Sequence, residues 1–120
     1  MMNIEDIRLY CLGKPQATED FPFDETTLVF RVMGKIFACI SLEHTDRITL
    51  KCEPDYALEL RERYACITGA WHWNKKYWNQ IDITSGDVSA ALLRRLIDHA
   101  YDEVVKKLPR KLRAQLAGGE

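Results

Sequence analysis

The residues with the richest chemistry in this chain lie in one short segment, WHWNKKYW at positions 71–78. The segment contains all three tryptophans, together with a tyrosine, a histidine and two adjacent lysines. Aromatic rings stack on nucleobases and lysines neutralise phosphates, so this mixture is typical of a nucleic-acid contact. The same residues also suit a packed hairpin whose lysine turn is simply solvated and blunts an exposed edge. The sequence leaves open whether Trp71, Trp73 and Trp78 are core or surface residues.

Catalytic motifs are not evident elsewhere in the chain. The sequence has no nucleophile elbow, no glycine-rich phosphate loop and no HExxH pair. His72 is the one histidine that lies among aromatic and basic residues, but no carboxylate partner is apparent near it in the sequence. We therefore expect no enzymatic activity, and an enzyme centred on His72 is the remaining alternative.

The cysteines do not indicate a metal site or a disulfide framework. They are widely spread, with no CxxC pair, at positions 11, 39, 52 and 66. Zinc sites use clustered Cys and His ligands, and disulfide frameworks are usually denser and follow an export signal. We expect no metal ligands and no cofactor.

Composition indicates one globular domain. The chain has 120 residues, of which 47% are apolar and 29% charged, with a net charge of -1. We expect a single domain over 1–117 and a tail over 118–120. No apolar run is long enough for a membrane span, and Glu5 and Asp6 stand where an export signal is basic, so we expect a cytoplasmic protein without a membrane partner. The near-neutral charge excludes a broadly basic coat, but basic residues gather towards the C-terminus, including Lys106 and Lys107.

The elements that must position the aromatic segment follow from the periodicity. We expect helices at about 3–12, 54–63, 87–108 and 109–117, and strands at 27–33, 36–42, 47–52, 68–73 and 78–83. Asn3 and Asp87 are the expected N-caps. Residues 13–26 are expected to form a long loop pinned by Phe21 and Phe23. This order predicts a two-layer α+β fold, α-β(3)-α-β(2)-α with an antiparallel sheet and a short extra C-terminal helix.

Alternation within the strands predicts which face of the sheet is open. Ile36, Ala38, Ile40 and Leu42 share one predicted buried face. Arg47, Thr49 and Lys51 alternate with apolar residues and are expected on the open face. Gly34-Lys35 suits a type II′ turn between the first two strands.

Four blocks of the chain resemble the MmcQ/YjbR family of small bacterial proteins. They are GKPQATEDFPFDETTLVFRVMGKIFACISLE, LKCEPDYALELRERY, GAWHWNKKYWNQIDI and LLRRLIDHAYDEVVKKLPRKLR. The resemblance covers nearly the whole chain, as far as Arg113. This chain differs in having Glu53 where the family commonly has Asp, and Trp73 where it often has Met or Leu.

The resemblance implies the fold expected above and a DNA-binding function, because the family's two hairpins are similar to a double-wing arrangement. The contact residues it implies here are Lys75, Lys76 and Trp78, with Asn74 and His72 beside them. The second choices are Lys35 at the first hairpin tip and Lys51 on a strand. It implies no catalytic residue.

The expected function is weak, mainly phosphate-directed binding of nucleic acid, duplex DNA above all, through the hairpin tips. The alternative is a protein-interaction module. The same layered architecture resembles that of secretion chaperones, and the Trp-rich hairpin or the open sheet face could dock a protein segment.

Overall fold

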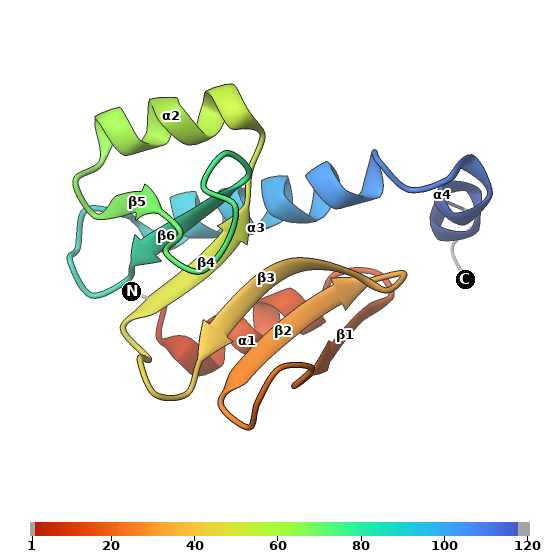
Figure 1. Ribbon diagram of the computed structural model, residues 1–120, viewed down its shortest axis with the longest axis horizontal. Helices are drawn as coiled ribbons and strands as arrows, with labels where there is room; N and C mark the ends of the chain where they lie inside the picture. The colour runs from red at the N-terminus through yellow and green to blue at the C-terminus, as the bar shows by residue number, and fades with distance from the viewer. Residues whose placement is uncertain (1, 118–120) are drawn as a thin grey trace.

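A six-stranded antiparallel sheet organises the computed structural model, which describes residues 2–117 (Figure 1). The strands are β1 (Ala17–Asp20), β2 (Thr27–Val32), β3 (Lys35–Ser41), β4 (Arg47–Lys51), β5 (Ile67–Gly69) and β6 (Trp78–Asp82), in the spatial order β1-β2-β3-β4-β6-β5. The helices are α1 (Ile4–Leu12), α2 (Pro54–Arg63), α3 (Ala90–Val105) and α4 (Arg110–Ala117). The predicted α+β class is confirmed. The predicted tail, 118–120, lies outside the described residues.

The helices lie on one side of the sheet. Figure 1 shows α1 and α3 behind the strands and α2 beside β5, while α4 extends beyond the end of α3. The core between the layers is apolar and includes Phe30, Ile48, Ile81 and Ile97, each at most 1% exposed. Between residues 2 and 117, no helix covers the opposite face of the sheet, which we call the open face. Within the described residues, no helix is both long and apolar enough to cross a bilayer.

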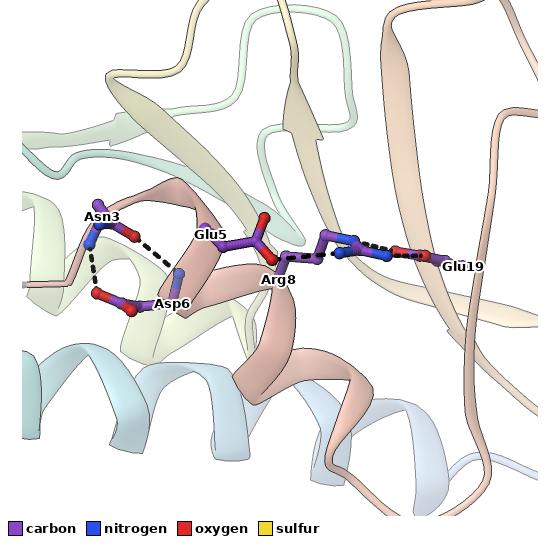
Figure 2. A network of polar contacts seen from close by, with 5 residues as sticks. All are labelled: Asn3, Glu5, Asp6, Arg8 and Glu19. Atoms are coloured by element: carbon purple, nitrogen blue, oxygen red, sulfur yellow. Dashed lines mark hydrogen bonds and ion pairs between the residues drawn. The ribbon is translucent and has the colours of Figure 1, made fainter.

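Helix α1 begins with the predicted cap and is fastened to the sheet by an arginine (Figure 2). Asp6 N donates to Asn3 Oδ1 at 2.8 Å, and Asn3 N donates to Asp6 Oδ2 at 3.1 Å, which makes a capping box. Arg8 donates to both carboxylate oxygens of Glu19 on β1, at 2.9 and 2.7 Å. This two-point contact ties the first helix to the edge strand.

Strand β1 was not expected, because the sequence predicts a loop over 13–26. Its four residues, ATED, show no apolar alternation and have low strand propensity. They form a strand because the edge of β2 offers backbone partners, from Ala17 opposite Val32 to Asp20 opposite Val29. Arg31 of β2 adds a cross-strand ion pair with Asp20, at 2.8 Å.

The β2–β3 connection differs by one residue from the prediction. The two turn residues are Met33 and Gly34, with φ of 50° and 84°, so the turn has the positive φ values of type I′ and Lys35 already belongs to β3. A register shift between Phe30 and Arg31 then brings the side chain of Phe37 into the core.

The bulge changes which residues of β3 are buried. Phe37 is completely buried, and its ring centroid lies 5.4 Å from that of Tyr101 on α3. Ala38 and Ile40 are buried as predicted, whereas Ile36 is half-buried and Leu42 is 49% exposed. A one-residue bulge is not visible in an alternating pattern, which is why the pattern placed Ile36 inside. Leu42 keeps the phase of Ala38 and Ile40 but lies beyond the end of β3 at Ser41.

Helix α3 begins later than predicted. Its N-cap is Ser89, whose Oγ accepts from Leu92 N at 3.0 Å, and not Asp87. Both residue types are good N-caps, so local preference alone did not separate them.

The second hairpin is the largest departure from the predicted boundaries. The strand predicted at 68–73 is only Ile67–Gly69, so residues 70–77, which we call the aromatic loop, connect β5 to β6. Trp71 and Trp73 therefore lie on a loop and not on a strand.

Candidate functional site

The aromatic loop is held in place by one arginine of α2. Arg61 Nε donates to Asn79 Oδ1 at 2.7 Å, and its Nη2 donates to the backbone oxygens of Lys75 and Trp78, the latter at 3.4 Å. Asn79 is only 2% exposed and donates in turn to the carbonyl of Ala57 at 3.3 Å. The sequence analysis did not identify Arg61, because nothing in a helix pattern shows that a residue reaches a loop 14 positions away.

The three tryptophans lie on the open side of the sheet and differ in burial. Trp78 is 8% exposed and stands opposite Lys51 of β4. Trp73 is half-buried and packs on Trp78 with ring centroids 4.4 Å apart, while Trp71 is 74% exposed. The question that the sequence left open therefore has a different answer for each residue: Trp78 is buried, Trp73 is half-buried and Trp71 is on the surface.

Lysines from three parts of the chain surround Tyr77. The Nζ atoms of Lys51, Lys107 and Lys76 lie 5.0, 5.3 and 5.5 Å from its ring centroid. Lys75 Nζ lies 5.2 Å from the ring centroid of Trp71. We call these four residues, Lys51, Lys75, Lys76 and Lys107, the lysine cluster; each makes a cation–π contact.

The lysine cluster has no carboxylate partners within the described residues. The ion pairs there involve Arg8, Lys14, Arg31, Arg47 and Lys106. The carboxylate of Glu103 is paired with Lys106 and acts on Lys51 only from beyond ion-pairing distance, so the positive charge around Tyr77 is only partly offset, which favours an external anion.

Lys51 shows the effect of this crowding. Burial lowers the pKa of its ammonium group, and the nearby charge of Lys107 lowers it further, while Glu103 acts in the opposite direction. An anion placed at the cluster would relieve the repulsion between the two lysines.

The structure assembles part of the predicted site. Lys51, Lys75, Lys76 and Trp78 come together around the aromatic loop. Lys35 does not join them, since the β2–β3 turn points towards α4 in Figure 1, away from the loop between β5 and β6.

The remaining predicted residues have distinct places. Asn74 Oδ1 accepts from Lys76 N at 3.0 Å and so shapes the turn. His72 is exposed, with its ring centroid 6.3 Å from that of Trp71. The structure adds Tyr77 and Lys107, which were not predicted. Tyr77 belongs to the aromatic segment 71–78, so its residue type was visible in the sequence. The position of Lys107 beside it depends on how α3 packs.

A cavity of about 790 Å³ lies over the open face beside the aromatic loop. Its sides include Phe23, Trp71, His72 and Trp73, and its other lining residues are Asp24, Thr27, Cys39, Ser41, Glu43, His44, Arg47, Thr49 and Gln80. Phe23 packs edge-on against Trp73 at 6.1 Å, yet it is 62% exposed, and Phe21 is 45% exposed. Of the two phenylalanines predicted to pin this segment, Phe23 contacts the aromatic loop through Trp73, but both remain largely exposed and neither is a buried anchor.

Cys39 and Asp24, which both line the cavity, have pKa values shifted in a way that fixes their charge. Burial, with a smaller contribution from the charge of Asp24, raises the pKa of the Cys39 thiol to about 12. Hydrogen bonds from the backbone N–H groups of Thr26 and Thr27 lower the pKa of Asp24. Near neutral pH the thiol is therefore protonated and the carboxylate charged. Among residues 2–117, no three His, Cys, Asp or Glu side chains gather as metal ligands would.

Known proteins resemble this chain along most of its length. Protein YjbR of Escherichia coli strain K12 is 29% identical over 119 residues, which cover 96% of this chain and 100% of that protein. Protein YbdF of Escherichia coli O157:H7 is 35% identical over 109 residues, covering 89% of this chain and 88% of its own.

Solved structures share the fold. A crystal structure of a Deinococcus radiodurans protein has a TM-score of 0.87 and 34% identity, covering 98% of this chain and 89% of its own. A Pseudomonas syringae protein, with a TM-score of 0.71 and 23% identity over 85% of this chain and 98% of its own, shows the same fold. The YjbR family model matches residues 12–103, so the chain belongs to the YjbR family.

Proposed function

We propose that this protein binds nucleic acid, duplex DNA above all, mainly through backbone phosphates at the lysine cluster. The observation that carries the proposal is the gathering of Lys51, Lys75, Lys76 and Lys107 on aromatic rings, without carboxylate partners in the described part of the chain. Phosphates neutralised by such lysines release counterions, which makes the binding strongly salt-dependent.

The arrangement supports phosphate contact more than base readout in a duplex. Sequence readout in the major groove usually needs a helix or a two-stranded ribbon that carries several base-reading side chains. The lysine cluster is small and lies on a protein with a net charge of -1, so the expected affinity is low. The role proposed is binding and not catalysis.

The family resemblance also favours DNA binding, with the second hairpin as the first choice of contact and Lys35 of the first hairpin as a second choice. In this proposal the lysine cluster contacts the phosphates directly and Lys35 does not, because Lys35 stands apart from the cluster. The β2–β3 turn then contributes at most a weak, long-range attraction.

Fluorescence anisotropy with a labelled duplex at two salt concentrations tests the proposal. The double variant Lys75→Ala/Lys76→Ala should bind more weakly, and the slope of log K against log salt should fall by about 1.8, since each lost phosphate contact accounts for about 0.9. Arg110→Ala/Lys111→Ala on α4 removes the same charge from exposed positions and is the matched control. Absence of salt-sensitive binding, or an equal loss in both variants, would refute the proposal.

A protein-interaction role is the second candidate. It is favoured by the exposure of Trp71 (74%) and Phe23 (62%) on the sides of the cavity, since exposed aromatic anchors are common in protein interfaces. Nuclease-treated pull-downs at high salt, compared between wild type and Trp71→Ala, separate this role from phosphate binding. A partner retained by the wild type alone would support it, and equal recovery would exclude Trp71 as an anchor.

A further inference from the structure

Aromatic side chains form the sides of the cavity on the open face. Trp71 and Trp73 come from the aromatic loop, and Phe23 comes from the segment between β1 and β2. The rings of Phe23 and Trp73 are nearly perpendicular, at 74°. Trp71 is 74% exposed, so much of its ring remains available to a ligand. A flat ring that stacks on such side chains gains roughly 5- to 150-fold in affinity.

Polar side chains line the sheet surface beneath these rings. Cys39, Thr49 and Gln80 stand opposite one another on β3, β4 and β6, and all three line the cavity. The Thr49 hydroxyl and the Gln80 amide each supply both a donor and an acceptor. The edge of a nucleobase, which also carries donors and acceptors, is complementary to such a surface.

The lysine cluster adjoins this polar surface along β4. Thr49 and Lys51 are alternate residues of β4 and share its open face, and two residues of a strand span roughly 6.8 Å. The connection is continuous, because Trp73 of the cavity packs on Trp78, and Lys51 Nζ lies 5.3 Å from the Trp78 ring centroid.

Charges at the opposite end of the cavity orient a ligand. Asp24 and Glu43 lie there, near the paired residues Thr27 and Ser41, while Arg47 is engaged by Asp46 at 2.9 Å. His44 also lines the cavity. An anionic group is repelled by the two carboxylates and attracted by Lys51, so a ligand with a neutral ring and one anionic group points its charge towards the cluster.

We propose that this cavity binds an unpaired nucleobase, with the phosphate of the same nucleotide at the lysine cluster. The inference rests on the proposed function, since it uses the same lysines, and it changes the preferred ligand from duplex to single strand. Contact with phosphates alone favours a duplex, which has the higher charge density. A base in the cavity favours a strand whose bases are free. The base can belong to a strand or to a free nucleotide.

The test compares oligonucleotides that have the same number of phosphates. Anisotropy at one salt concentration is measured for a single strand with bases, for a fully abasic strand of equal length, and for a duplex. We expect the strand with bases to bind at least about 5-fold tighter than the abasic strand. We also expect it to bind tighter than the duplex.

Two variants locate the base. Gln80→Leu keeps the side-chain size but removes the amide, and Trp71→Ala alters an exposed residue, so both should fold; circular dichroism and thermal unfolding check this. Each should reduce the ratio between the base-containing and abasic strands. The control Lys107→Ala should weaken both ligands by the same factor and leave the ratio unchanged.

Free ligands identify the source of the base. If adenosine monophosphate competes with the strand and ribose 5-phosphate does not, a free nucleotide occupies the cavity. Competition by polymer alone indicates a strand.

The outcomes separate this inference from the proposed function. Salt-sensitive binding with equal affinity for base-containing and abasic strands overturns the cavity inference and leaves phosphate binding intact. Retention of the ratio by both Gln80→Leu and Trp71→Ala overturns it as well. If no DNA binds, the proposed function fails. The cavity is then tested by the quenching of tryptophan fluorescence with free ligands. Equal quenching by adenosine monophosphate and by ribose 5-phosphate, which has no base, refutes the cavity inference too.

Discussion

The β2–β3 turn and the aromatic loop both join neighbouring antiparallel strands, but they present their lysines differently. The β2–β3 turn has two residues, and the cation beside it, Arg31, is paired with Asp20 and also donates to Gly34 O at 3.0 Å. The aromatic loop has eight residues, 70–77, and its lysines lie on aromatic rings with further lysines from β4 and the end of α3.

The comparison shows that two connections with similar topology need not share a function. Lys35 is a single exposed charge at the start of β3, beside a tight turn, while the lysine cluster is assembled from three parts of the chain. A concentration of unneutralised charge requires a scaffold that holds it, and here the scaffold is Tyr77 with the two packed tryptophans. The predictions below are ordered by the size of the expected effect.

Arg61→Leu should have the largest effect, because Arg61 donates to three acceptors in and beside the aromatic loop, whereas Arg31 donates to a single carbonyl of the β2–β3 turn. Loss of Arg61 leaves the buried Asn79 Oδ1 and the Lys75 carbonyl without this donor, while the Trp78 carbonyl keeps the bond from Ala70 N at 3.1 Å. We expect a loss of about 2–3 kcal/mol in the free energy of unfolding, measured with urea. Arg63→Ala, at the exposed end of the same helix, is the control and should change stability by less than about 0.5 kcal/mol. Equal effects would show that the loop does not depend on Arg61.

Lys51→Met/Lys107→Met should weaken DNA binding on the order of tenfold at moderate salt, because two phosphate contacts are lost. Lys35→Ala should weaken it less than about twofold, since a single distant charge acts only through the screened field. Anisotropy titrations on one duplex measure both. If Lys35→Ala proves as damaging as the double variant, the two connections act together and the distinction drawn here is wrong.

Gly34→Ala should destabilise the β2–β3 turn by about 1–2 kcal/mol, because a residue with Cβ is strained at φ 84°. Binding of DNA should not change. Gly34→Asn is the control, since Asn tolerates positive φ and should recover much of the stability. Thermal unfolding and anisotropy measure the two properties, and a loss of affinity in Gly34→Ala would link the turn to the site.

Lys107→Ala should raise the pKa of Lys51 towards its ordinary value, because it removes a neighbouring positive charge. The pKa of Lys51 is lower in the folded protein than in the unfolded chain, so the unfolded chain binds more protons between the two values. Stability contributed by this group therefore increases as the pH rises through that window, and Lys107→Ala should reduce the increase. NMR titration of the Lys51 side chain measures the pKa. Lys76→Ala is the control, and an unchanged Lys51 pKa in Lys107→Ala would contradict the assignment.

Much of the fold follows from local patterns in the sequence. The capping box at Asn3, the alternation in β2 and β4, and the apolar stripe of α3 each express a preference that acts within a few residues. Strand β1, the bulge that buries Phe37 and the short length of β5 could not be predicted, because each depends on a partner strand.

The candidate site also has one part that the sequence shows and another part that depends on tertiary contacts. The residue types were evident in the sequence, because Trp71, Lys75, Lys76 and Trp78 stand within one segment. The sequence by itself determined that aromatic rings and lysines occur together, and it determined the α+β class through the periods of its apolar residues.

Only the tertiary structure decided how these residues are used. It placed Lys51 and Lys107 beside Tyr77, set Arg61 under the aromatic loop and opened the cavity between Phe23 and the tryptophans. Each of these contacts joins residues far apart in the chain. Their positions depend on the register of β4 with β6 and on the packing of α2 and α3, which no local pattern specifies.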